Sequence, residues 1–197
     1  MGASSDIGAA IAADLAGVGY DVALWGRDVG RLRASADGCR AAGGHATYVS
    51  LDVTDVAAAR LALREVLSRG GLSVVVWAAG VFDWASADEA EADTWRTLLD
   101  VNLTAAAVVT TQVLPALVEA APSALVYIGS GASRQAFANN AAYVASKHGL
   151  AGLAGATFLD VRDRDVKVSL VSPGLVSAGA GLLSEAGRHR PQDLLTA

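Results

Sequence analysis

The sequence is poor in cysteine and in clustered charge. Cys39 is the only cysteine, which excludes an internal disulfide and a cysteine-based metal site. The three histidines are not spaced as metal ligands, so we expect no metal; they are His45, His148 and His189. The 15 basic and 20 acidic residues are spread along the chain without a Lys/Arg cluster. This distribution argues against a nucleic-acid partner.

A secretory signal segment and an uninterrupted apolar run are also lacking. The most apolar stretch, residues 101–121, is broken by several polar residues and by Pro115, which favours a buried helix over a membrane span. We therefore expect a cytoplasmic protein that does not contact a membrane. A length of 197 residues and a mean hydropathy of +0.39 predict a single domain, residues 1–197, with a large core.

Short apolar runs alternate with longer segments of helical period. The expected strands are 21–25, 46–51, 72–78, 123–129 and 166–172, and the expected helices lie near 7–18, 28–42, 55–69, 93–121 and 140–160. Strict alternation predicts a doubly wound parallel sheet with helices on both faces, a three-layer α/β/α, Rossmann-like fold. Ligands of such sheets bind at the carboxyl ends of the strands, where the loops collect.

A glycine-rich turn, "MGASSDIG", leads straight into the first expected helix. Gly2 and Gly8, with small residues between them, would let backbone N–H groups approach a pyrophosphate; the loop residues in this set are Gly2, Ser4, Ser5, Asp6, Ile7 and Gly8. An ordinary tight turn before a helix is the alternative, because the spacing is not G-x-G-x-x-G.

No strand precedes this turn, although a doubly wound sheet of order 3-2-1-4-5-6 has its central strand there. We therefore expect a missing first strand, unpaired edges on strands 21–25 and 72–78, and a loop without its anchor. The expectation is that the chain is incomplete at both ends, with a further helix and strand after residue 197.

The residues that follow the expected strands 21–25 and 46–51 bear on the choice of cofactor. Arg27 follows strand 21–25 and suits a 2′-phosphate, so NADP(H) is favoured over NAD(H); Asp28 is a contrary sign, and a solvated loop cation is the alternative. Asp52 could bind the adenine amino group, with Val53 beside the ring, or Asp52 could cap the helix that begins near 55.

The strongest signal is Tyr143-x-x-x-Lys147, with Ser130 thirteen residues before the tyrosine. Four tyrosines and two lysines would give such a pair by chance only about 0.04 times in this length. On a helix the two side chains share a face. A lysine ammonium would lower the phenol's pKa toward neutrality and could hold the nicotinamide ribose, and Ser130 would hydrogen-bond the substrate oxygen. Alternatively, Tyr143 is a core aromatic and Lys147 a surface cation.

These motifs together resemble the short-chain dehydrogenase/reductase family over essentially the whole chain. The resemblance rests on "GASSDIG", "AAG" (78–80), "VNL" (101–103), the Ser, Tyr and Lys just named, and "SPG" (172–174). It implies that Asn102 kinks its helix and holds a water linked to Lys147. It also implies that Ala79 and Gly80 brace the sheet beside the cofactor, that Pro173 and Gly174 approach the nicotinamide, and that the protein is a homodimer or homotetramer.

The departures from the family pattern are local. Met1 stands for the usual Thr and Asp6 for the middle Gly of the glycine motif, and Ala78 replaces a frequent Asn. After Pro173-Gly174, Ala178 takes the place of a frequent Thr that contacts the cofactor's carboxamide.

The sequence therefore predicts an NADP(H)-dependent oxidoreductase that interconverts a ketone and a secondary alcohol, with Tyr143 as general acid/base. The alternatives are a non-catalytic nucleotide-binding relative or inactive fragment, and an epimerase or dehydratase using the same site. Phe82 and Trp84 follow Gly80 and could either wall a substrate site or pack in the core.

Overall fold

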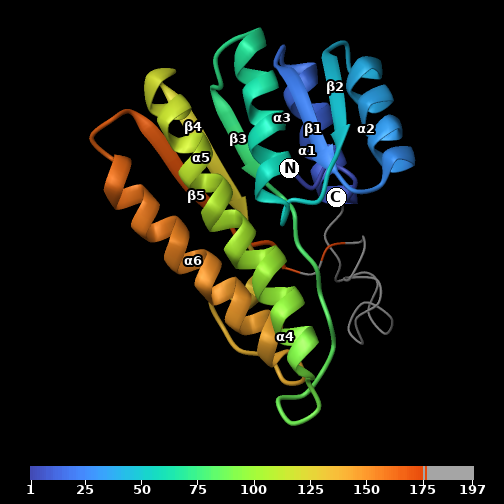
Figure 1. Ribbon diagram of the computed structural model, residues 1–197, viewed down its shortest axis with the longest axis vertical. Coiled ribbons are helices and arrows are strands. Elements are labelled where there is room, and N and C mark those ends of the chain that lie inside the picture. Colours follow the sequence, from blue (N-terminus) through green and yellow to red (C-terminus); the bar gives the residue numbers. More distant parts are fainter. Residues whose placement is uncertain (175, 177–197) are drawn as a thin grey trace. The chain divides into compact units, whose positions relative to one another are not determined.

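The structure, a computed structural model, describes residues 1–174 and 176 (Figure 1). The chain divides into two compact units. The first contains residues 1–52 and the segment from Pro173, and the second contains residues 53–172. The single domain expected over residues 1–197 stays a prediction.

The first unit is a parallel two-stranded sheet with two helices. Its elements are α1 (Asp6–Gly17), β1 (Asp21–Gly26), α2 (Val29–Ala41) and β2 (His45–Ser50), each within two residues of the expected bounds. The ladder pairs Asp21 with His45 and continues to Gly26 with Ser50. Side chains cap both helices: the Ser5 hydroxyl accepts from the Gly8 N–H, and the Asp28 carboxylate accepts from the Arg31 N–H.

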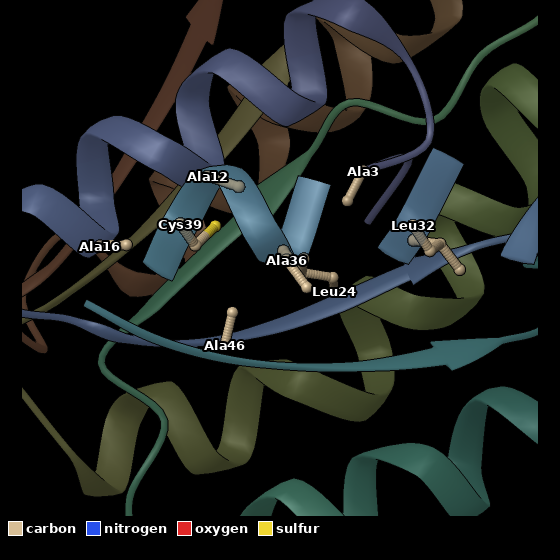
Figure 2. Close-up of a cluster of buried hydrophobic side chains, with 8 residues drawn as sticks. All are labelled: Ala3, Ala12, Ala16, Leu24, Leu32, Ala36, Cys39 and Ala46. Carbon is tan, nitrogen blue, oxygen red and sulfur yellow. The ribbon is translucent and has the colours of Figure 1, made fainter. Parts of the chain in front are cut away.

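Small side chains fill the core of this unit, which Figure 2 shows: Ala3, Ala12, Ala16, Leu24, Leu32, Ala36, Cys39 and Ala46. Because five of these eight residues are alanines, the helices approach the strands closely. A Cβ at Gly44 would lie 2.5 Å from the Ala16 carbonyl oxygen, so only glycine fits where α2 leads into β2. Cys39 is buried in this core.

The second unit carries three parallel strands in the order β3-β4-β5. Its elements are α3 (Val56–Arg69), β3 (Val74–Trp77), α4 (Ala92–Leu99), a π-helical turn η1 (Asp100–Thr104), α5 (Ala105–Glu119), β4 (Ser123–Ile128), a 3₁₀ turn η2 (Gly131–Ser133), α6 (Ala141–Val161) and β5 (Val166–Val171). The order agrees with the order expected for strands 72–78, 123–129 and 166–172. The parallel α/β, Rossmann-like fold class is confirmed.

Helices α5 and α6 pack side by side on this sheet, with α5 against β3 and β4 and α6 against β5 (Figure 1). A buried hydrogen bond joins the sheet to α5: the Tyr127 hydroxyl of β4 lies 2.6 Å from the Thr110 hydroxyl of α5. Thr157 of α6 is a further hydrogen-bond partner of Tyr127. Burial nevertheless raises the pKa of Tyr127 above its ordinary value.

One continuous helical run, Ala92–Glu119, is long and apolar enough to cross a membrane by length and composition alone. The same test is passed by core helices of soluble proteins, so this run is weak evidence for a span. Among the residues that the structure describes, no group of three or more His, Cys, Asp or Glu side chains could hold a metal ion.

Candidate active site

The glycine loop of the first unit is folded by hydrogen bonds within a few residues. Ser5 donates from its backbone N–H to the Gly2 carbonyl at 3.0 Å and from its hydroxyl to the same oxygen at 2.8 Å. The same hydroxyl accepts from the Gly8 N–H at 3.1 Å. Gly2 has a φ of 80°, in the left-handed region that favours glycine.

The expectation that the loop lacks an anchor is wrong. The N–H groups of Gly2 and Ala3 both donate to the Trp25 carbonyl, at 2.8 and 3.0 Å, so the loop is tied to β1 beside it in the same unit. The Ala3 carbonyl accepts from the buried Ser35 hydroxyl of α2 at 2.7 Å. These contacts fix the start of the loop at the end of β1, whereas β1 pairs only with β2 among the described strands, so its other edge is unpaired there as expected.

The loop has the properties of a phosphate cradle. A Cβ at Gly8 would lie 2.3 Å from the Gly2 carbonyl oxygen, so only glycine lets the first turn of α1 pack against the start of the loop. The N–H groups of Asp6 and Ile7 open α1 and have no acceptor among the described residues. Two free donors at a helix N-terminus beside a glycine suit a pyrophosphate. The Asp6 carboxylate forms an ion pair with Arg31, so its negative charge is partly neutralised.

Arg27 is exposed after β1, and none of residues 1–174 or 176 forms an ion pair with its guanidinium. Its neighbour Asp28 has a different task, because its carboxylate caps α2. Gly26 lies directly against the loop: a Cβ there would lie 2.6 Å from the Ser4 hydroxyl and 3.3 Å from the Leu32 side chain. The glycine therefore holds the loop against the strand end.

Of the two roles considered for Asp52, capping the helix that begins near residue 55 is wrong. The residue that caps α3 is Asp55, whose carboxylate accepts from the N–H groups of Ala57 and Ala58, both at 3.0 Å. Asp52 is exposed and Val53 is 8% exposed. Gly174 is exposed, with open space where its Cβ would be. Ala178 lies outside the described residues.

In the second unit, Tyr143 and Lys147 occupy the first two turns of α6, so they share a face. The Lys147 ammonium lies 5.7 Å from the centre of the Tyr143 ring and donates to the Ile128 carbonyl at 3.2 Å. Lys147 is 5% exposed, which rules out the surface cation considered from the sequence. Tyr143 is half-buried, and its hydroxyl has the Ser130 side chain as a hydrogen-bond partner.

Ser130 is placed by the turn that follows β4. Its hydroxyl accepts from the Ala132 N–H at 3.2 Å, while its own N–H donates to the Ser133 hydroxyl at 3.1 Å, which makes a reciprocal capping box. Gly129 is required before it, because a Cβ there would lie 2.7 Å from the Ser133 hydroxyl. The sequence singled out Ser130 but gave no reason to notice Ser133.

The pKa directions correct one sequence expectation. Burial raises the pKa of Tyr143 above its ordinary value, and the Ser130 hydrogen bond opposes this only in part. Burial also lowers the pKa of Lys147 to about 8. Lys147 therefore loses its charge before Tyr143 titrates, so in the chain by itself it does not bring the phenol toward neutrality. With its pKa raised above the ordinary value, the phenol is protonated at neutral pH, as a free tyrosine also is.

Asn102 lies in the π-helical turn between α4 and α5 and is completely buried. Such turns are common where a helix is interrupted at a functional site. Its side-chain oxygen accepts from the Val81 N–H at 2.7 Å, and its amide nitrogen donates to the Val81 carbonyl at 2.9 Å and to the Ser146 hydroxyl at 3.0 Å. Ser146 in turn donates to the Tyr143 carbonyl at 2.7 Å. The water implied by the family resemblance stays a prediction.

Gly80 brings Asn102 and Lys147 to one point. A Cβ at Gly80 would lie 3.3 Å from the Asn102 side-chain oxygen and 3.4 Å from the Lys147 ammonium nitrogen. Ala79 before it is buried. The second unit thus brings together Asn102, Ser130, Tyr143 and Lys147 at the carboxyl ends of β3 and β4, as expected of a parallel sheet.

Comparison with known proteins places this geometry in a family. The model of the short chain dehydrogenase family matches residues 1–186. The chain belongs to the short-chain dehydrogenase family. As a member, it is an oxidoreductase with a Rossmann-like fold, which confirms the resemblance drawn from its motifs.

Individual short-chain dehydrogenases agree with this assignment. The chain is 36% identical over 178 residues to an uncharacterized oxidoreductase of Myxococcus xanthus, covering 90% of this chain and 70% of that protein. It is 35% identical over 132 residues to trans-4-hydroxycyclohexanecarboxylate dehydrogenase of Sinomonas cyclohexanicum, covering 66% of this chain and 51% of that protein. A metagenomic short-chain oxidoreductase solved with NADP has a TM-score of 0.82 and 38% identity, over 89% of this chain and 80% of that one.

Proposed function

We propose that this chain is an NADP(H)-dependent oxidoreductase that interconverts a ketone and a secondary alcohol, with Tyr143 as its general acid/base. The observation that carries the proposal is the Tyr143 hydroxyl, which has the Ser130 side chain as a hydrogen-bond partner and lies one helical turn from the buried Lys147. Neither an ordinary core tyrosine nor a surface lysine accounts for this arrangement.

Each side chain has a distinct task in the proposed reaction. A bound nicotinamide supplies or accepts the hydride. Tyr143 donates its proton to the ketone oxygen during reduction and takes it back from the alcohol during oxidation. Ser130 donates a hydrogen bond to the same oxygen and so fixes the carbonyl against the phenol. Lys147, with its pKa near 8, can exchange a proton close to neutral pH.

The glycine loop and Arg27 support NADP(H) over NAD(H). The N–H groups of Asp6 and Ile7 suit the pyrophosphate and the Arg27 guanidinium suits a 2′-phosphate, since none of them has a partner among residues 1–174 and 176. Asp28 no longer argues for NAD(H), because its carboxylate is occupied as the α2 cap. The metagenomic relative solved with NADP is consistent with this preference.

The activity test follows NADPH consumption at the nicotinamide absorbance with a panel of ketones. We expect turnover that depends on the ketone and that reverses with the corresponding secondary alcohol and NADP⁺. NADPH binding without turnover of any carbonyl would instead support a non-catalytic nucleotide-binding protein.

The cofactor preference is tested with Arg27→Ala. Loss of a charge-assisted contact with the 2′-phosphate should weaken NADPH binding by about 10- to 100-fold, and NADH binding should change little. Arg33→Ala removes another exposed arginine, one in α2, and is the matched control. Equal NADPH affinity in the wild type and Arg27→Ala would contradict the assignment.

We also propose a cytoplasmic homo-oligomer that binds no nucleic acid. Helix α6 supports the oligomer, since Gly152 and Gly155 face open space while Phe158 and Leu159 are 47% and 60% exposed. Light scattering on the eluting protein should give a dimer or a tetramer. A monomer at micromolar concentration would contradict this part of the proposal.

A further inference from the structure

Aromatic side chains continue from Tyr143 toward the surface of the second unit. The Phe82 ring meets the Tyr143 ring edge-on, with centres 4.9 Å apart and planes at 79°. The Trp84 ring follows, 6.0 Å from Phe82. Phe82 is half-buried and Trp84 is 50% exposed. Core packing, the alternative considered from the sequence, does not account for a half-exposed tryptophan next to Phe82, the ring that contacts Tyr143.

A third aromatic side chain lies on the Ser130 side. The Phe137 ring is 3.6 Å from the point where a Cβ of Gly131 would lie, and Gly131 follows Ser130 directly. Phe137 is 47% exposed. A parallel β-bridge between Ala85 and Asn140 joins the loop that carries Trp84 to the segment that carries Phe137. The three aromatic residues therefore come from two connected segments. The segment of Phe82 and Trp84 starts at Gly80, beside Lys147, and the segment of Phe137 leads into α6, which carries Tyr143.

The loop of Phe82 is held in place from behind. Both backbone groups of Val81 are bound by the Asn102 side chain, so the residue next to Phe82 has a fixed position. The polar neighbour in the loop is also engaged: the Asp83 carboxylate accepts from the Trp84 N–H at 2.8 Å and from the Thr94 hydroxyl at 3.3 Å. A fixed aromatic surface binds flat apolar groups with little loss of conformational entropy.

We propose that Phe82, Trp84 and Phe137 form the wall of the substrate site and that the preferred substrate is a ketone or secondary alcohol carrying a ring beside the reacting carbon. This aromatic wall rests on the proposed function of Tyr143 and names the substrate class for it. A ring on the substrate can contact Phe82 by edge or face while the carbonyl oxygen reaches Tyr143 and Ser130. Asn102 acts as a positioning residue for the wall through Val81.

The kinetic test compares 1-indanone, a ring ketone, with 2-butanone, a small acyclic ketone. The wild type should reduce 1-indanone with a kcat/KM at least about tenfold higher, because only the ring contacts the wall. Phe82→Ala and Trp84→Ala should each lower kcat/KM for 1-indanone more than kcat/KM for 2-butanone and so remove most of this preference. Phe82→Leu keeps an apolar side chain of similar size and should retain the fold while losing the ring contact.

Tyr20→Ala removes a 41% exposed aromatic side chain of the first unit and should change neither ketone's kinetics. Equal kcat/KM for both ketones in the wild type, or an equal loss for both in Phe82→Ala, would overturn the aromatic wall and leave the proposed function standing.

A binding measurement separates the two proposals. Saturation-transfer NMR should show contact with 1-indanone in the wild type, weaker contact in Phe82→Ala and Trp84→Ala, and none with 2-butanone. If no ketone is reduced but this pattern is present, the aromatic wall is supported and the proposed function fails. If the pattern is absent, the aromatic wall is overturned whatever the activity.

Discussion

The two units of this chain prepare for chemistry in opposite ways. In the first, the described core is apolar and rich in alanine, Ser35 is the one buried polar side chain among those residues, and the glycine loop offers backbone N–H groups. In the second, eight polar or charged side chains are buried: Asn102, Thr110, Ser123, Ser133, Asn140, Ser146, Lys147 and Thr157.

The difference shows what each task requires. Under the proposed function the first unit binds a pyrophosphate through backbone donors, and the loop keeps its shape because Gly8 and Gly26 lack side chains that would meet Gly2 and Ser4. The second unit transfers a proton, which needs a group that titrates near neutral pH, and burial supplies one at Lys147. The first unit should therefore be sensitive to added atoms, and the second to lost or altered polar atoms.

The largest expected effect is that of removing one oxygen from Tyr143. Tyr143→Phe should lower kcat for ketone reduction by about 10²- to 10⁴-fold, because the proton donor is lost while the ring stays against Phe82. Tyr127→Phe removes an equivalent oxygen from a structural contact with Thr110 and is the matched control. It should cost about 1–2 kcal/mol of unfolding free energy and leave kcat nearly unchanged. Comparable kcat losses in both variants would contradict the division of roles.

The next effect is that of adding one carbon to the glycine loop. Gly8→Ala puts a Cβ against the Gly2 carbonyl and should destabilise the first unit by about 1–3 kcal/mol and abolish NADPH binding. Gly38→Ala adds the same carbon at an exposed position of α2, where nothing lies within 4 Å, and should stabilise the protein by about 0.5–1 kcal/mol. Urea unfolding and NADPH fluorescence measure both; normal NADPH binding by Gly8→Ala would refute the cradle.

Lys147→Met tests the cost of the buried charge. Because the folded-state pKa of about 8 lies below the ordinary 10.5, the charged lysine destabilises the fold fully below pH 8, and the cost fades as pH rises to 10.5. The variant should gain up to about 3 kcal/mol of unfolding free energy over wild type at pH 7 and nothing above pH 10.5. Lys167→Met, at an exposed lysine of β5, is the control. A gain that does not vary with pH would contradict a buried ammonium as its cause.

The smallest effect sharpens the pKa assignment within the second unit. In the cofactor-free chain, ¹³C NMR of labelled tyrosine should place the pKa of Tyr143 above 10. Ser130→Ala should raise it further, since it removes the hydrogen bond that lowers the pKa. Lys147→Met should change it less, because Lys147 is already neutral when the phenol titrates. A larger shift from Lys147→Met would restore the role expected from the sequence.

Element bounds were predictable because local chemistry sets them. The expected strand 166–172 ends one residue after β5, and the expected helix 140–160 differs from α6 by one residue at each end, since apolar period and flanking polar residues act over a few positions. Tyr143, Lys147 and Ser130 were found in the same way, through spacing on a helix and at a strand end. Asp55 was missed as the α3 cap because Asp52 and Asp55 look alike in sequence and only backbone geometry selects one.

The sequence by itself determined the alternating parallel fold and the family, and it singled out Ser130, Tyr143 and Lys147 as candidate site residues, because these depend on periodicity and on short spacings. Only the tertiary structure decided the protonation of the site. Lys147 reads as a long cation in the sequence, and its pKa of about 8 arises from the packing that buries it against the Ile128 carbonyl. The tertiary structure also decided where Phe82 and Trp84 lie, because only the fold places the Phe82 ring beside Tyr143 and the Trp84 ring beside Phe82. Burial and contact join residues distant in the chain, and no local pattern records them.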